Sequence, residues 1–147
     1  MSDPSSRALL NHLIESCKDG EHGFIHAAEL VSDPGLKTLF SDLAGRRARA
    51  AEELLPHAQR FGGSAATDGT TAASMHRRWM DVRSNLSGHD DRTILREAQR
   101  GDAITLAAYK TALDGLLPPS VRDLVERQYG EVRDTHDDLA RSLTEAM

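Results

Sequence analysis

Hydrophobic residues recur at steps of three and four along most of the chain, a spacing that predicts long amphipathic helices. The stretch over residues 94–116 has the pattern most clearly, and its apolar positions are Leu95, Ala98, Leu106, Tyr109, Leu113 and Leu116. The same reading along the rest of the sequence predicts four long helices and one shorter helical segment, over residues 5–31, 34–61, 90–116, 118–145 and 71–86.

The lengths of the connections between these helices suggest how they are arranged. Ser32-Asp33-Pro34 and Leu117-Pro118-Pro119-Ser120 are short, so the helices on either side of each should be antiparallel neighbours. The long connection between the two hairpins can return along the bundle, which leaves the second and third long helices parallel. We therefore expect an all-α, single-domain protein over residues 1–147. The arrangement is a ferritin-like four-helix bundle whose long crossover carries a short extra helix.

Composition narrows the class of protein. Aromatic residues make up 4% of the 147 residues, and the net charge is −5, whereas dedicated nucleic-acid binders usually have a basic face. The single cysteine, Cys17, sits in an apolar run and is expected to be a buried thiol without a disulfide partner. No run of 18 apolar residues occurs. We expect a cytoplasmic protein that binds neither nucleic acid nor membranes.

Each long helix has one ionisable residue in its apolar stripe. These residues are Glu21, Arg47, Asp102 and His136. At about 1.5 Å of rise per residue, all four fall within about one turn of the same height in the bundle. Buried charges are costly unless they are paired, so the sequence predicts a polar network in which Arg47 bridges the two carboxylates, His136 donates to one of them and Gln128 lies nearby.

Several sequence runs also resemble those of a known family: LNHLIESCKDGEHGF from Leu10, Phe61-Gly62-Gly63, MHRRW from Met75, and LPPSVRDLVERQYGEV from Leu117. Their combination is similar to an uncharacterised bacterial ferritin-like four-helix-bundle family, a domain-of-unknown-function family. The resemblance covers nearly the whole chain. It implies the fold and a cytoplasmic bacterial setting, and it carries no assigned activity.

The ferritin-like group suggests a second interpretation of the polar layer, because its di-iron proteins take metal ligands from Glu and Glu-x-x-His positions facing the core. This sequence contains no Glu-x-x-His, and Arg47 stands where the second helix would supply a ligand. A guanidinium cannot coordinate a cation, so a complete di-metal centre is not expected. A single iron or zinc ion held by Glu21, Asp102 and His136 is the alternative to the network. A third possibility is that one stripe is misassigned and some of these groups face solvent.

Other candidate sites are weaker. Asp19, His22 and His26 share one helical face at a spacing that suits a surface metal, although solvated histidines are the commoner explanation. Small basic clusters at residues 46–49 and 76–78 could bind a small anion or an acidic partner.

These features favour a non-catalytic bundle protein with a stress-related or interaction role, which could form a homodimer. The alternative is a metal-binding ferritin-like protein that oxidises or stores iron. If the protein is an enzyme, a non-haem iron oxidase is the expected type.

Overall fold

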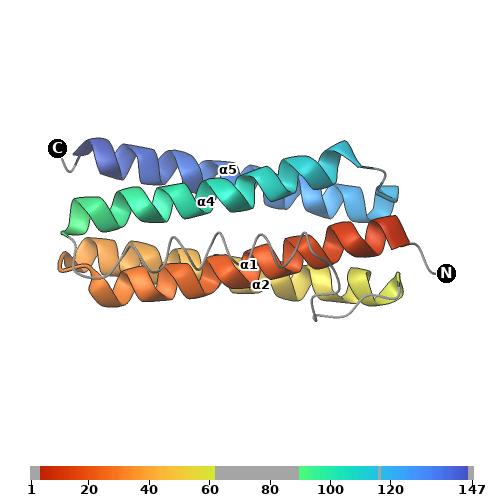
Figure 1. The fold of residues 1–147 in the computed structure, drawn as a ribbon, viewed down its shortest axis with the longest axis horizontal. Coiled ribbons are helices and arrows are strands. Elements are labelled where there is room, and N and C mark those ends of the chain that lie inside the picture. The colour runs from red at the N-terminus through yellow and green to blue at the C-terminus, as the bar shows by residue number, and fades with distance from the viewer. Residues whose placement is uncertain (1–3, 62–89, 116, 146–147) are drawn as a thin grey trace.

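The structure is a computed structural model that describes residues 4–61, 90–115 and 117–145. Within these ranges the chain forms four helices and no strand, α1 (Pro4–Leu30), α2 (Pro34–Arg60), α4 (Asp91–Asp114) and α5 (Pro119–Glu145) (Figure 1). The prediction of an all-helical chain with four long helices is confirmed. The short helix predicted over residues 71–86 lies outside the described residues.

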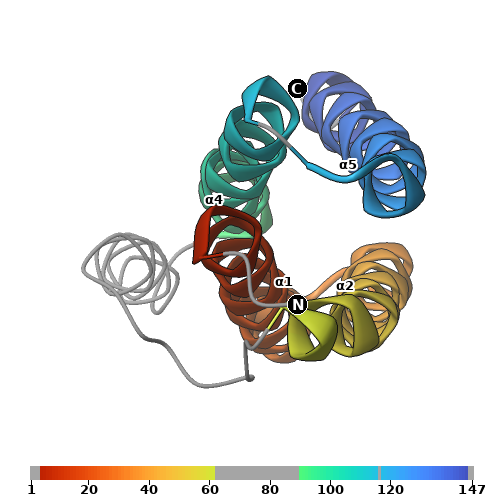
Figure 2. The same ribbon diagram turned by 90° about the vertical axis from the view of Figure 1, so that its right-hand side faces the viewer.

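The four helices lie side by side with their axes roughly aligned (Figure 1). In the end view α1 lies between α2 and α4, and α5 lies on the other side of α4, so α2 and α4 face each other diagonally (Figure 2). Helix α4 begins at the end of the bundle where α1 turns into α2 (Figure 1). Helices α2 and α4 therefore run in the same direction, and α1 and α5 run in the opposite one.

Carboxylates fix the end of the bundle where α4 begins. The Asp33 side chain accepts a hydrogen bond from the Leu36 amide at 2.9 Å, and Pro34 takes the first helical position of α2. The Asp91 carboxylate accepts from the backbone amides of Ser32 at 2.7 Å and Asp33 at 2.9 Å. The first turn of α4 is thereby tied to the α1–α2 turn, which sets the relative height of the two hairpins.

The apolar core has two parts. One lies toward the α1–α2 turn and consists of Phe24, Ala27, Val31, Phe40, Leu43, Ala44, Ile94, Leu95, Ala98 and Leu139. The other fills the opposite half of the bundle and is built mainly from Leu10, Leu13, Ile14, Cys17, Leu54, Tyr109, Val121, Val125 and Val132. On α2 and α4 the buried side chains between the two parts are those of Arg47, Asp102 and Thr105, all polar. The structure thus has a polar layer at mid-height, where the interrupted stripes predicted one.

Candidate functional site

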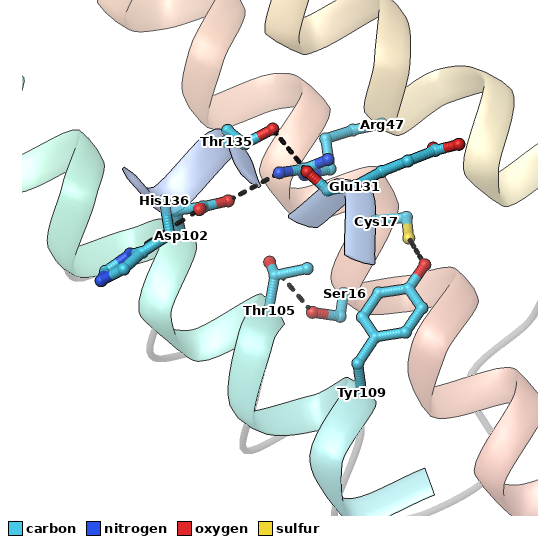
Figure 3. A network of polar contacts seen from close by, with 9 residues as sticks. All are labelled: Ser16, Cys17, Arg47, Asp102, Thr105, Tyr109, Glu131, Thr135 and His136. Carbon is cyan, nitrogen blue, oxygen red and sulfur yellow. Dashed lines mark hydrogen bonds and ion pairs between the residues drawn. The ribbon is translucent and has the colours of Figure 1, made fainter. Parts of the chain in front are cut away.

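The centre of the polar layer is an ion pair between diagonally opposed helices. Arg47 of α2 donates from Nη2 to Oδ1 of Asp102 on α4 over 2.9 Å (Figure 3). Arg47 is 1% exposed and Asp102 is 0% exposed. The Arg47 guanidinium also lies over the Phe24 ring, with Cζ 5.8 Å from the ring centroid. A charged arginine is therefore enclosed by the core, with a carboxylate and an aromatic face as its partners.

His136 of α5 extends this pair toward the surface. Its Nδ1 atom lies 3.9 Å from Oδ2 of Asp102, and its side chain is 29% exposed. Both atoms are buried and have no hydrogen-bond partner among the described residues, and the same holds for Nε of Arg47. The layer therefore combines one well-formed ion pair with three buried polar atoms that have no hydrogen-bond partner in the described part of the chain.

Burial dominates the electrostatics of Asp102. Loss of solvent raises the pKa of its carboxyl above the ordinary value, and the neighbouring Arg47 and His136 offset only part of that effect. Within the described ranges Oδ1 accepts one hydrogen bond and Oδ2 has no donor, which agrees with a raised pKa. The charge of Asp102 thus depends heavily on Arg47.

A second polar chain crosses the bundle on the side away from the α1–α2 turn. The Cys17 sulfur of α1 lies 3.2 Å from the hydroxyl of Tyr109 on α4, which donates to Oε1 of Gln128 on α5 over 2.7 Å. The Gln128 amide then donates to Oε1 of Glu53 on α2 over 3.0 Å and to the Ala50 carbonyl over 3.3 Å. All four described helices contribute to this chain, which runs from a buried thiol to an exposed carboxylate.

Burial sets the protonation of the groups at the inner end of this chain. It raises the pKa of the Cys17 thiol and raises that of Tyr109 well above 10. At the outer end the guanidinium of Arg127, 2.7 Å from the Glu53 carboxylate, lowers the pKa of that carboxyl. Cys17 is therefore a protonated, buried thiol, and the sequence-based expectation for it agrees with the structure.

The structure brings together only part of the predicted network. Arg47, Asp102 and His136 are neighbours, and Gln128 belongs to the second chain. Glu21 is half-buried and lines cavities on the outer face of α1 and α2, and no described hydrogen bond joins it to the layer. The buried positions on that part of α1 are Asp19 and Gly20. The predicted stripe on α1 was displaced by one residue, which turns a side chain by about 100° around the helix.

The weaker candidates are dispersed. Asp19 is buried, His22 is exposed and His26 is intermediate, so the three side chains differ in their surroundings. Among the residues that the structure describes, no group of three or more His, Cys, Asp or Glu side chains is arranged to hold a metal ion. The basic cluster at residues 46–49 is divided, because Arg47 points inward, and the cluster at 76–78 lies outside the described residues.

Two polar contacts of the layer were missed by the sequence analysis. Ser16 donates to the Thr105 hydroxyl over 3.3 Å, which joins α1 to α4, and the Thr135 hydroxyl donates to the Glu131 carbonyl within α5 (Figure 3). Small hydroxyl side chains pack almost as well as alanine, so the apolar pattern gives no signal for them. Their positions within otherwise apolar stripes are the only hint in the sequence.

A groove of about 570 Å³ lies between α2 and α5. Over most of their described length these two helices are not in close contact. Its α2 wall includes Arg46 and Arg49, and its α5 wall includes Glu131 and Asp134. Arginines and carboxylates thus face each other across it, so the Arg46–Arg49 cluster shares its surroundings with acidic groups.

Comparison with known proteins gives a family without an activity. Among the described helices, none combines the length and apolar character needed to cross a membrane. No similar curated protein is found. The model of one family matches residues 7–115, a range that includes Arg47 and Asp102 and leaves out α5. Because this match covers well over half of the sequence, the chain belongs to that family, DUF2383, which is described as a domain of unknown function.

Proposed function

We propose that this protein is a non-catalytic bundle of the ferritin-like type, in which an arginine supplies the positive charge at the centre of the core, and that its role is interaction with a protein partner. Two hairpins joined so that α2 and α4 are parallel support the ferritin-like assignment. A cytoplasmic bacterial setting is part of the same proposal and follows from the resemblance to that group.

One observation carries the non-catalytic assignment, namely the 2.9 Å contact between the buried side chains of Arg47 and Asp102. A guanidinium is protonated at all ordinary pH values and has no lone pair to offer a metal. It neutralises the carboxylate that a core metal ion would need as a ligand, and its own charge repels a cation placed beside it. The core charge is therefore balanced by the chain itself.

A second candidate function is metal binding at the outer edge of the same layer. Oδ2 of Asp102 and Nδ1 of His136 are buried and lie 3.9 Å apart, and neither has a hydrogen bond to any residue that the structure describes. Carboxylate and imidazole groups suit iron or zinc. The residues fit such an ion only in part, because the described residues offer two ligands here and Arg47 lies on the opposite side of the carboxylate. A di-metal centre does not fit these residues.

Metal content separates the two functions. The protein is expressed in medium supplemented with iron or zinc, dialysed, and measured by mass spectrometry for metal per chain, together with His136→Ala, and with His22→Ala as an exposed control. The proposal expects far less than one metal per chain in all three proteins, and an unchanged helical circular dichroism spectrum after chelator treatment. One metal per chain in the natural protein and in His22→Ala, lost in His136→Ala, would establish metal binding instead.

A further inference from the structure

The outer face of the α1–α2 hairpin has an apolar groove. Two adjoining cavities of about 520 and 210 Å³ lie along it, and Glu21 lines both. Small residues of α2, including Ala44, Gly45 and Ala48, line the groove and allow another helix to approach closely. Ile25 also lines it and is 41% exposed, the only large hydrophobic side chain exposed among the described residues. An apolar centre within a charged rim is the usual composition of a protein interface.

The charged rim is unpaired among the residues that the structure describes. Lys18, Glu21 and Glu52 line the groove and take part in no ion pair among the described residues. Lys37 donates to the backbone carbonyl of Ala28 over 3.2 Å and has no carboxylate partner among those residues. The rim therefore offers positive and negative groups that are available to a partner.

The pattern along α1 is complementary to itself. If two copies of α1 lie antiparallel, every facing pair of residues has the same sum of residue numbers, because each step forward on one helix is a step back on the other. The register that places Lys18 opposite Glu21 of the second copy also places the exposed Ile25 opposite Ile14, a core residue that is 1% exposed and lines the second cavity. One alignment thus pairs both charges and sets the exposed Ile25 of each copy over the cavity that Ile14 of the other copy lines.

The pattern along α2 gives the same result independently. The register that places Lys37 opposite Glu52 of the second copy also places Ala44 opposite Gly45, so the smallest residues meet at the centre. The two registers share one axis, because Glu21 lines the same cavity as Ala44 and Gly45 and thus lies at the height where α2 would meet its copy. A rotation about a single axis satisfies both helices.

We infer that this face binds a second copy of the chain in an isologous homodimer, with the two-fold axis perpendicular to the helices and passing near Gly45. Both partners use the same surface, as closed two-fold symmetry requires. The proposed function is interaction with a protein partner, and this inference identifies the partner as a second copy of the chain. It rests on the proposed function in this respect alone. It shares no residue with the Arg47–Asp102 pair, so a monomeric protein would refute the dimer without changing the metal content that tests the core.

A glycine substitution tests the axis without disturbing the monomer. A Cβ atom at Gly45 would meet only the Arg49 guanidinium at 3.6 Å, an ordinary contact, and one at Gly130 of α5 would meet nothing within 4 Å. Sedimentation velocity is measured between about 1 and 100 μM, the range in which a dimer of micromolar Kd dissociates. We expect a dimer for the natural chain and for the matched control Gly130→Gln, and a monomer for Gly45→Gln. A monomeric natural chain, or a Gly45→Gln dimer as tight as the natural one, would refute the interface.

Charge reversal tests the register. Lys18→Glu and Glu21→Lys each place two pairs of like charges across the axis, so each variant alone should dimerise at least about tenfold more weakly. An equimolar mixture of the two should form a heterodimer, because every pair across the interface is then of opposite charge. The double variant Lys18→Glu/Glu21→Lys should dimerise like the natural chain. Failure of both the mixture and the double variant to recover dimerisation would overturn this register.

Discussion

Replacing Arg47 by methionine removes the charge that the core layer depends on while keeping most of the side-chain volume. Asp102 is 0% exposed, and its only described hydrogen bond comes from Arg47. In the variant this carboxylate would be left inside the bundle without the Arg47 guanidinium, its ion-pair partner at 2.9 Å. Removing one partner of a buried ion pair typically costs about 3–5 kcal/mol, and we expect a loss in that range. The contact with Phe24 is lost as well, which is worth up to about 2 kcal/mol in a desolvated site.

The same reasoning predicts the rescue and its pH dependence. In the double variant Arg47→Met/Asp102→Leu no charge is left unpaired, and replacing a buried pair by apolar residues of similar size is often neutral or stabilising by about 1–4 kcal/mol. Burial already raises the pKa of Asp102, and without Arg47 its neutral form is favoured still more. Since a raised carboxyl pKa adds stability as pH falls through it, the deficit of Arg47→Met should shrink as pH is lowered from neutral toward the ordinary aspartate range.

Urea unfolding followed by helical circular dichroism measures each free energy. The matched control is Arg49→Met, the same change on an exposed residue of α2, which should stay within about 0.5 kcal/mol of the natural protein. A loss below about 1 kcal/mol for Arg47→Met, or a double variant less stable than either single variant, would refute the assignment of a buried ion pair.

Two further predictions concern the second polar chain and the end of the bundle where α4 begins. Burial raises the pKa of Tyr109 and of Cys17, so as pH rises above about 9.0 the unfolded chain releases these protons first and stability falls, by up to about 1.4 kcal/mol per pH unit for each group. In Tyr109→Phe, the free energy of unfolding in urea should fall less steeply between pH 8 and 11, because the contribution of Tyr109 is removed. The same pH dependence as in the natural protein would contradict the prediction. Asp91→Ala deprives the amides of Ser32 and Asp33 of their acceptor, and a thermal melt should reveal a loss of about 1 kcal/mol. A melting temperature identical to that of the natural protein would mean that water replaces the carboxylate at no cost.

The elements that could be predicted from the sequence are those set by local periodicity. The apolar stripes and the caps at Asp33 and Pro34 depend on residues within a few positions of one another, so the four helices follow from the pattern alone. Arg47 and Asp102 could be identified because each interrupts a dense apolar stripe, and a charged side chain buried in that position needs a partner of opposite charge.

The position of Glu21 could not be predicted in the same way. Between Cys17 and Phe24 the stripe on α1 should have one more core-facing position, but no large apolar residue occurs there. Either Gly20 or Glu21 fits the helical period. The structure buries Gly20 and leaves Glu21 on the outer face. A glycine carries no hydropathy signal, so the pattern could not distinguish two positions that differ by about 100° around the helix.

The contacts of the second polar chain depend on tertiary structure. Tyr109 was recognised as a core position, but its hydroxyl partners on α1 and α5 lie 92 and 19 positions away along the chain. Such pairings depend on the rotation and height of each helix in the bundle. No local pattern specifies those quantities.

The diagonal contact between α2 and α4 also constrains how this sequence can evolve. A lineage that loses only the arginine or only the aspartate is left with an isolated buried charge, so each single step is selected against even where the final apolar pair would be stable. Relatives of this chain should therefore carry either both charged residues or neither at the positions of Arg47 and Asp102, and intermediates with one of them should be rare.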